Sequence, residues 1–164
     1  MRDIKRIILH CSDSPDENDK VDAKMIKTWH KERGWKDIGY HFVITRDGSI
    51  QIGRPIHIPG AHVKGHNDDS IGICWVGRNL MTDYQVAGIR QCISGIFGLH
   101  EGLGIASIFG HNDFNPNKTC PNLNIHWVRA MMLSTYHLLI GKHKHHLMLL
   151  DGGEREDVDN QLDT

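Results

Sequence analysis

The sequence has almost no net charge and no long apolar run. Its 19 Lys and Arg residues are balanced by 20 Asp and Glu residues, so the formal net charge is −1 over 164 residues. Such a balance does not favour electrostatic capture of nucleic acid or of an anionic membrane. The first apolar run, Ile7 to Leu9, is too short for a signal peptide, and no run approaches the ~20 residues of a membrane-spanning helix. We therefore expect no nucleic-acid or membrane partner, and synthesis in the cytoplasm.

Cysteine is also scarce, whereas histidine is abundant. The four cysteines are widely spaced in a chain large enough to form a core, so we interpret them as reduced thiols rather than a disulfide scaffold. Of the 13 histidines, three lie in the basic segment HKHH at 143–146. This segment is expected to be a solvated basic patch, with a second metal site as the alternative. The other ten histidines are spread through the chain and include candidate metal ligands and acid–base groups.

The pattern of apolar residues predicts one domain in which strands alternate with helices. The β-branched run that ends at His10 predicts a buried strand, and Asp22 and Gly34 bracket a helix of about three turns. The remaining predicted elements are a hairpin at Asp47-Gly48, a strand over 71–77, a helix capped by Thr82 and Gln85, a strand over 105–110 and a helix over 124–140. We therefore predict an α/β fold for residues 1–140, with a mixed central sheet flanked by helices. Residues 141–164 lose this pattern and are expected to form a polar, disordered tail.

Two predicted strands end in histidine, and both lead into polar loops. His10 ends the first strand, and His111 follows the strand over 105–110. Cys120 comes nine positions later, in the loop GHNDFNPNKTCPN at 110–122, which is poor in helix or strand signals. Two histidines and a cysteine are suitable zinc ligands, and three protein ligands leave a fourth position for water, as in catalytic sites. These three residues are therefore candidate ligands of a catalytic zinc ion, and their spacing alone does not decide the matter.

Two other interpretations use the same residues. Cys11 is an alternative ligand, but adjacent strand residues point to opposite faces, so Cys11 should face the core if His10 faces the site. The other alternative is a cysteine nucleophile, with Cys120 paired to His111 or His62. No third residue that would orient such a pair is evident, and the pair would leave other histidines without a role. We therefore favour the zinc site.

Four segments, taken in order, resemble one enzyme family. They are ILHCSDS, WHKERGWKDIGYHFVITRDGSIQIGR, GAHVKGHNDDSIGIC and GHNDFNPNKTCP, and the similarity extends over roughly residues 4 to 137. The family is the type-2 N-acetylmuramoyl-L-alanine amidases, which include phage amidase-type lysozymes and peptidoglycan recognition proteins. The resemblance is strongest to the phage branch. It implies a mixed sheet with helices on both sides, and a shallow groove in which one zinc ion serves hydrolysis of the amide between muramic acid and L-alanine.

The resemblance also implies roles for individual residues. They are His10, His111 and Cys120 as zinc ligands, Tyr40 and Lys118 as catalytic residues, and His62 and Asn67 as groove residues that bind substrate. Lys118 would stabilise the oxyanion of the tetrahedral intermediate. A phenol with a pKa of about 10 is poorly matched to act as a general base at neutral pH, so Tyr40 is interpreted as a hydrogen-bond donor.

The chain also departs from the family pattern. Asn112, Phe114 and Asn117 replace the Arg, Leu and Gly types common in the family, and the tail from 141 onward has no counterpart there. The substrate is expected to be peptidoglycan or a muropeptide, cut by a monomer in phage or prophage lysis after release through a membrane lesion, or in recycling of wall fragments. The alternatives are a non-catalytic peptidoglycan-binding module and a regulatory protein that binds another polypeptide. Because Cys120 and Lys118 are both present, the enzyme is favoured.

Overall fold

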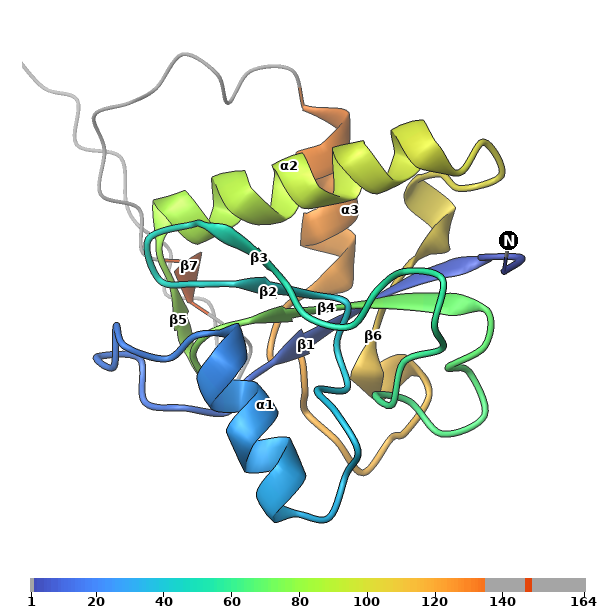
Figure 1. Cartoon of the computed structure of the whole chain (residues 1–164). Coiled ribbons are helices and arrows are strands. Elements are labelled where there is room, and N and C mark those ends of the chain that lie inside the picture. The colour runs from blue at the N-terminus through green and yellow to red at the C-terminus, as the bar shows by residue number, and fades with distance from the viewer. Residues whose placement is uncertain (1, 135–146, 149–164) are drawn as a thin grey trace, which may run out of the picture.

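A five-stranded mixed sheet forms the centre of the protein (Figure 1). The structure is a computed structural model, and it describes residues 2–134 and 147–148. Its strand order is β3-β2-β4-β1-β6, and only the β2–β3 pair is antiparallel. The strands are β1 (Arg6–Cys11), β2 (Phe42–Ile44), β3 (Ile50–Ile52), β4 (Ser70–Trp75) and β6 (Ile108–Gly110). The predicted α/β class with a mixed central sheet is therefore confirmed.

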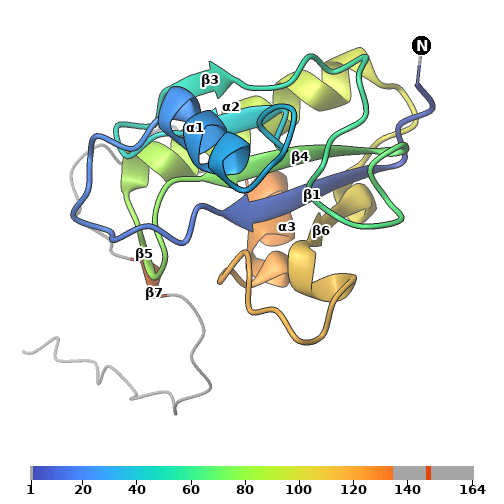
Figure 2. The same ribbon diagram turned by 60° about the horizontal axis from the view of Figure 1, so that its bottom comes forward.

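Helices cover both faces of this sheet (Figures 1 and 2). Helices α2 (Asp83–Leu99) and α3 (Ile125–Leu133) pack on one face, where Leu9 and Ile73 share a buried cluster with Ile93 and Val128. Helix α1 (Ala23–Glu32) packs on the other face, where Ile26 contributes to a smaller cluster. Because side chains alternate along a strand, His10 and Leu9 lie on opposite faces of the sheet. His10 is therefore on the face that α1 covers.

The predicted local signals are found where the sequence places them. The Asp22 side chain accepts a hydrogen bond of 2.7 Å from the amide of Met25 at the start of α1. Thr82 and Gln85 form the predicted capping box at the start of α2. Gly48 turns the β2–β3 hairpin with φ of +84°, a backbone region that glycine enters without a steric penalty. These contacts fix the ends of the elements around the sheet.

Two predicted elements are shorter than expected. In the segment 105–110, a 3₁₀ turn, η1 (Ile105–Ser107), precedes β6. The Ser107 hydroxyl accepts a hydrogen bond from the amide of Gly104, which favours a turn over an extended start. Helix α3 ends at Leu133, whereas the prediction ran to 140; positions 135–140 lie outside the described residues.

The C-terminal region is described only at one short strand. Residues Leu147–Met148 form β7, antiparallel to β5 (Leu80–Met81), in a separate two-stranded sheet. The HKHH segment and the rest of the predicted tail lie outside the described residues, so the domain boundary at residue 140 stays a prediction. Within residues 2–134 and 147–148, no helix is long and apolar enough to cross a membrane.

Acid should destabilise the fold through two buried histidines. His30 and His41 are 4% and 0% exposed, and each Nδ1 accepts a backbone hydrogen bond, from Gly39 and Gly72 respectively. Burial lowers the pKa of each imidazole to about 4. Between that value and the ordinary pKa of about 6.5, the unfolded state binds more protons than the folded state. The free energy of unfolding should therefore fall by about a few kcal/mol as the pH falls through this window.

Urea unfolding at about pH 7 and about pH 5 measures this effect. The variant His30→Asn keeps a hydrogen-bond acceptor for Gly39 but cannot titrate, so its stability should depend less on pH than that of the parent protein. His57→Asn changes an exposed histidine and serves as the control. An unchanged pH dependence in His30→Asn would rule out His30 as a source of the acid sensitivity.

Candidate metal centre and groove

Two neighbouring strands bring the predicted histidines to one edge of the sheet. Strands β1 and β6 are parallel and paired, with Leu9 opposite Gly110. The next residue along each strand is therefore His10 or His111, and their ring centroids lie 4.8 Å apart. His10 is fully buried, whereas His111 is half-buried at the start of the following loop.

The loop after His111 turns back and delivers Cys120 to the same point. The amide of Asn112 donates a hydrogen bond of 2.8 Å to the carbonyl of Cys120, which closes the loop. Cys120 Sγ lies 3.7 Å from His10 Nδ1 and accepts a hydrogen bond of 3.4 Å from the amide of Cys11. One ligand atom each from His10, His111 and Cys120 lies within 4.8 Å of the others. The three predicted ligands are therefore brought together.

The imidazoles of His10 and His111 are in the protonation state that a metal ligand requires. Burial, and then the neighbouring His62 and His111, hold the pKa of His10 well below its ordinary value. Burial, and then the charge of Lys118, lower the pKa of His111. Both imidazoles are therefore neutral at neutral pH, which is the form that binds metal ions. Two neutral imidazoles and one thiol are a donor set that fits zinc with a fourth position left for water.

Cys11 is placed differently from the three. Its thiol belongs to the core cluster that contains Leu9, on the other face of β1 from His10. Contact with Cys120, followed by burial, raises the pKa of the Cys11 thiol far above its ordinary value, so this thiol stays protonated. Because a metal ligand must be a thiolate, this placement does not favour Cys11 as a ligand.

A groove of about 770 Å³ opens beside the three candidate ligands. Its walls include Tyr40, His62, Asn67 and Lys118, each of which was predicted as a site residue. The ring centroid of Tyr40 lies 5.0 Å from that of His10, and burial raises the pKa of the phenol well above its ordinary value. The phenol of Tyr40 is therefore protonated at neutral pH and can donate a hydrogen bond. Lys118 is exposed in the loop between His111 and Cys120.

The two predicted substrate residues make contacts within the protein. The side-chain oxygen of Asn67 accepts hydrogen bonds from the amides of His62 and Val63, at 2.8 and 3.0 Å. Asn67 therefore stabilises the backbone of the groove wall and also lines the groove. His62 is 8% exposed, and its Nδ1 lies 3.0 Å from His10 Nε2. A substrate contact by either side chain stays a prediction.

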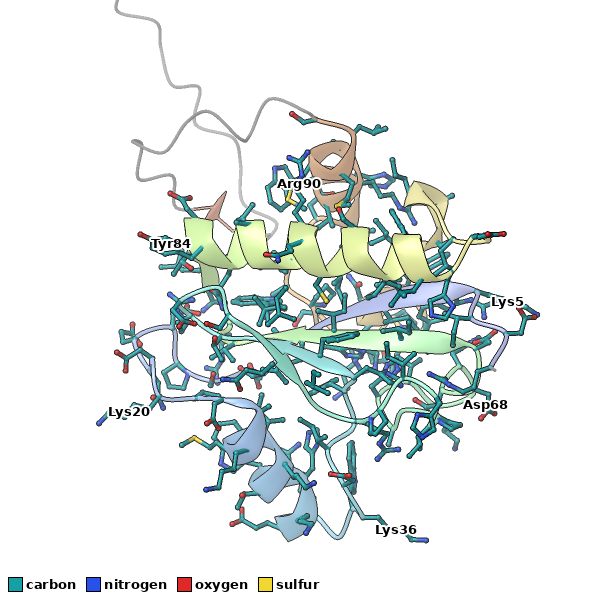
Figure 3. The ribbon with its side chains drawn as sticks, turned by 45° about the horizontal axis from the view of Figure 1, so that its top comes forward. Lys5, Lys20, Lys36, Asp68, Tyr84 and Arg90 are labelled. Atoms are coloured by element: carbon teal, nitrogen blue, oxygen red, sulfur yellow. The ribbon has the colours of Figure 1, made fainter. Side chains whose placement is uncertain are left out.

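Sequence reasoning missed other residues of the groove. Arg33 and Lys64 line it and, with Lys118, give it a positive charge that only Asp13 among the lining residues opposes. The ring centroid of Trp35 lies 4.5 Å from that of His30, and the Trp35 side chain lines the groove with 41% of its surface exposed. These residues follow a helix end or lie in a loop, where no periodic pattern marks them. The labelled Lys20 and Lys36, by contrast, point away from the body of the protein (Figure 3).

Comparison with known proteins gives the class of protein that this fold and site define. A family model described as N-acetylmuramoyl-L-alanine amidase matches residues 1–123. The chain belongs to this family, and its enzyme class is that of an amidase acting on a linear amide. An endolysin of Enterobacteria phage K11 is 38% identical over 140 residues, which cover 82% of this chain and 91% of that protein.

Solved structures agree with this family. The amidase LysC from Clostridium intestinale has a TM-score of 0.71 at 26% identity, covering 80% of this chain and 87% of that one. A variant of Drosophila PGRP-LB, solved in complex with tracheal cytotoxin, has a TM-score of 0.65 at 26% identity, covering 74% of this chain and 76% of that one. The fold is thus shared by an N-acetylmuramoyl-L-alanine amidase and by a peptidoglycan recognition protein.

Proposed function

We propose that the protein is a zinc-dependent amidase that cuts the bond between N-acetylmuramic acid and L-alanine in peptidoglycan. The observation that carries this proposal is the convergence of His10, His111 and Cys120 within 4.8 Å at a groove. Family membership and the similarity to phage endolysins support the reaction and its substrate. A lysis role of the phage or prophage type follows from these relatives, with the protein acting as a monomer on the wall.

The candidate ligands and Lys118 divide the chemistry between them. When bound, a zinc ion would supply Lewis acidity, which polarises the amide carbonyl and makes water acidic enough to react near neutral pH. His10, His111 and Cys120 would hold this ion. Lys118 would place its ammonium group beside the carbonyl oxygen as negative charge develops there, and so stabilise the transition state.

Tyr40 would orient a reactant rather than accept a proton. Its raised pKa keeps the phenol protonated, so it is a poor general base. A protonated phenol beside His10 can donate a hydrogen bond to the substrate carbonyl or to the attacking water. His62 and Asn67 would complete the wall of the groove next to this point.

A non-catalytic peptidoglycan-binding protein is the second candidate. The structural similarity to PGRP-LB, which was solved with tracheal cytotoxin, favours a groove that holds a muropeptide. In this case the protein would retain wall fragments without cutting them. The presence of Cys120 beside both histidines favours the amidase, because binding alone does not need a complete set of metal ligands.

Digestion of purified peptidoglycan distinguishes these functions. The zinc-loaded protein should release new L-alanine amino termini without new reducing sugar ends, and a chelator should stop the release. Added zinc should restore it. Reducing ends would instead indicate a glycosidase, and retention of wall fragments without any cleavage would support the binding protein.

A further inference from the structure

Three buried polar side chains form a chain of contacts that begins at a candidate metal ligand. His10 Nε2 lies 3.0 Å from His62 Nδ1, and His62 Nε2 lies 3.3 Å from the hydroxyl of Ser70. The Ser70 hydroxyl in turn donates to the carbonyl of His66. His10, His62 and Ser70 are 1%, 8% and 0% exposed. This relay lies behind the site, on the side of His10 away from Cys120.

We infer that His62 is a positioning residue, which fixes the tautomer and the ring orientation of His10 for metal binding. The inference rests on the proposed function, because His10 must be a metal ligand for its orientation to matter. It replaces a substrate contact as the main role of His62. Partners that hold the second nitrogen of a ligating imidazole tune the affinity for the metal.

The directions of the hydrogen bonds are consistent along the whole relay. His10 Nδ1 faces Cys120 Sγ, so this nitrogen must keep its lone pair to bind a metal. The proton of the neutral His10 ring is then on Nε2 and is donated to His62 Nδ1. His62 must therefore carry its own proton on Nε2, which it donates to the Ser70 oxygen. Because Ser70 donates onward to a carbonyl, which cannot donate, the sequence of donors has one direction only.

The backbone holds the His62 ring in place between two glycines. A Cβ atom at Gly60 would lie 2.4 Å from the ring of His62, and one at Gly72 would lie 2.7 Å from it. Neither glycine has a positive φ, so the close approach of the ring, rather than backbone conformation, requires glycine here. Gly72 lies in β4, which pairs with β1, the strand that carries His10. The ring of His62 is thus fixed by the same sheet that fixes the ligand.

Both ring nitrogens of His62 are used within the protein. Nδ1 contacts His10 and Nε2 contacts Ser70, so no ring nitrogen is left for a substrate group. His41 lies beside the ring, and its Nδ1 accepts a hydrogen bond from the amide of Gly72, so its Nε2 carries the proton and donates it to the carbonyl of Ile58. Both ring nitrogens of His41 are thus used, so His41 does not compete with His10 or Ser70 for the ring of His62. Its position suits the support of His10 better than recognition of peptidoglycan.

A pair of variants of similar size tests the role of His62. In His62→Asn the side-chain oxygen can take the place of Nδ1 and accept the proton of His10. In His62→Leu the volume is similar but no acceptor is present. The affinity for zinc is measured by competition with a chromophoric chelator, and urea unfolding of the metal-free proteins checks that both fold. We expect His62→Leu to bind zinc about 10- to 100-fold more weakly than the parent protein, and His62→Asn to recover most of that loss.

The tautomer of His10 gives a second measurement that needs no metal and no activity. Nitrogen-15 NMR of the metal-free parent protein should show His10 protonated on Nε2, and His62→Leu should show a mixture of tautomers. Gly72→Ala should weaken zinc binding in the same direction by displacing the ring. Gly95→Ala, in an exposed part of α2 with open space around it, is the matched control and should leave zinc binding unchanged.

Each result decides one of the two proposals. Equal zinc affinity in folded His62→Leu and in the parent protein would overturn the positioning role while leaving the amidase intact. An Nδ1-protonated His10 in the metal-free parent protein would overturn it as well. If the parent protein bound no zinc and released no L-alanine termini, the proposed function would fail, and with it the role of His62 toward a metal.

Discussion

The variant Cys120→Ser should lose zinc and reduce amidase activity to the level of the zinc-free protein. Cys120 supplies the only sulfur in the candidate ligand set, and a serine hydroxyl is a much weaker ligand for zinc than a thiolate. The fold should survive, because the serine oxygen can still accept the hydrogen bond from the amide of Cys11. Zinc content after dialysis and release of L-alanine termini measure the two effects.

Cys11→Ala is the matched control for this variant. It removes the neighbouring thiol, which lies in the core and was the alternative ligand, while leaving Cys120 in place. We expect normal zinc content, with some loss of stability from the smaller core side chain. If Cys120→Ser kept full activity, or if Cys11→Ala lost the metal instead, Cys120 could not be the ligand.

Lys118→Ala should keep the metal but lose most of the turnover. The ammonium group lies in the loop that joins His111 to Cys120, and its charge is close enough to lower the pKa of His111. Removing one group that stabilises a developing oxyanion typically costs about 100- to 1000-fold in kcat. We expect a loss of this size with little change in KM, since the stabilised charge appears only in the transition state.

Two further variants show whether a loss of turnover in Lys118→Ala is specific to that lysine. Lys64→Ala removes a second cation of the groove and should alter KM more than kcat, because no observation places it beside the ligands. Tyr40→Phe removes only the phenol hydroxyl and should lower kcat by less than Lys118→Ala if the phenol orients a reactant. An unchanged kcat in Lys118→Ala would make this lysine an ordinary surface residue.

The sequence was informative where the signals are local. The Asp22 cap, the Asp47-Gly48 turn and the Thr82–Gln85 capping box each depend on residues within a few positions of one another, and all are present. The histidines at strand ends were also found, because apolar runs mark the strands and the polar residue that follows is easy to see. Assigning them to one site needed the resemblance to a family as well.

Other features depend on contacts between distant segments. The order β4-β1-β6 determines that His10 and His111 meet, and no local pattern in the chain gives this order. The relay from His10 through His62 to Ser70 depends on the approach of two glycine backbones to one ring. Glycine at 60 and 72 could equally mark turns or flexible points, so the sequence does not reveal this contact. For the same reason the groove positions of Arg33 and Lys64 were missed.

The distance along the chain between the ligands has a consequence for folding. His10 and Cys120 lie 110 positions apart, yet their side chains meet at the end of β1. The site cannot exist until the first strand and the loop at 110–122 have both docked, so the unfolded chain lacks the assembled set of ligands. A bound ion would crosslink these two segments and so stabilise the folded state. At a free zinc concentration 100 times Kd, binding would add about 2.7 kcal/mol to the free energy of unfolding. Withdrawal of zinc would then make the enzyme inactive and also easier for proteases to degrade.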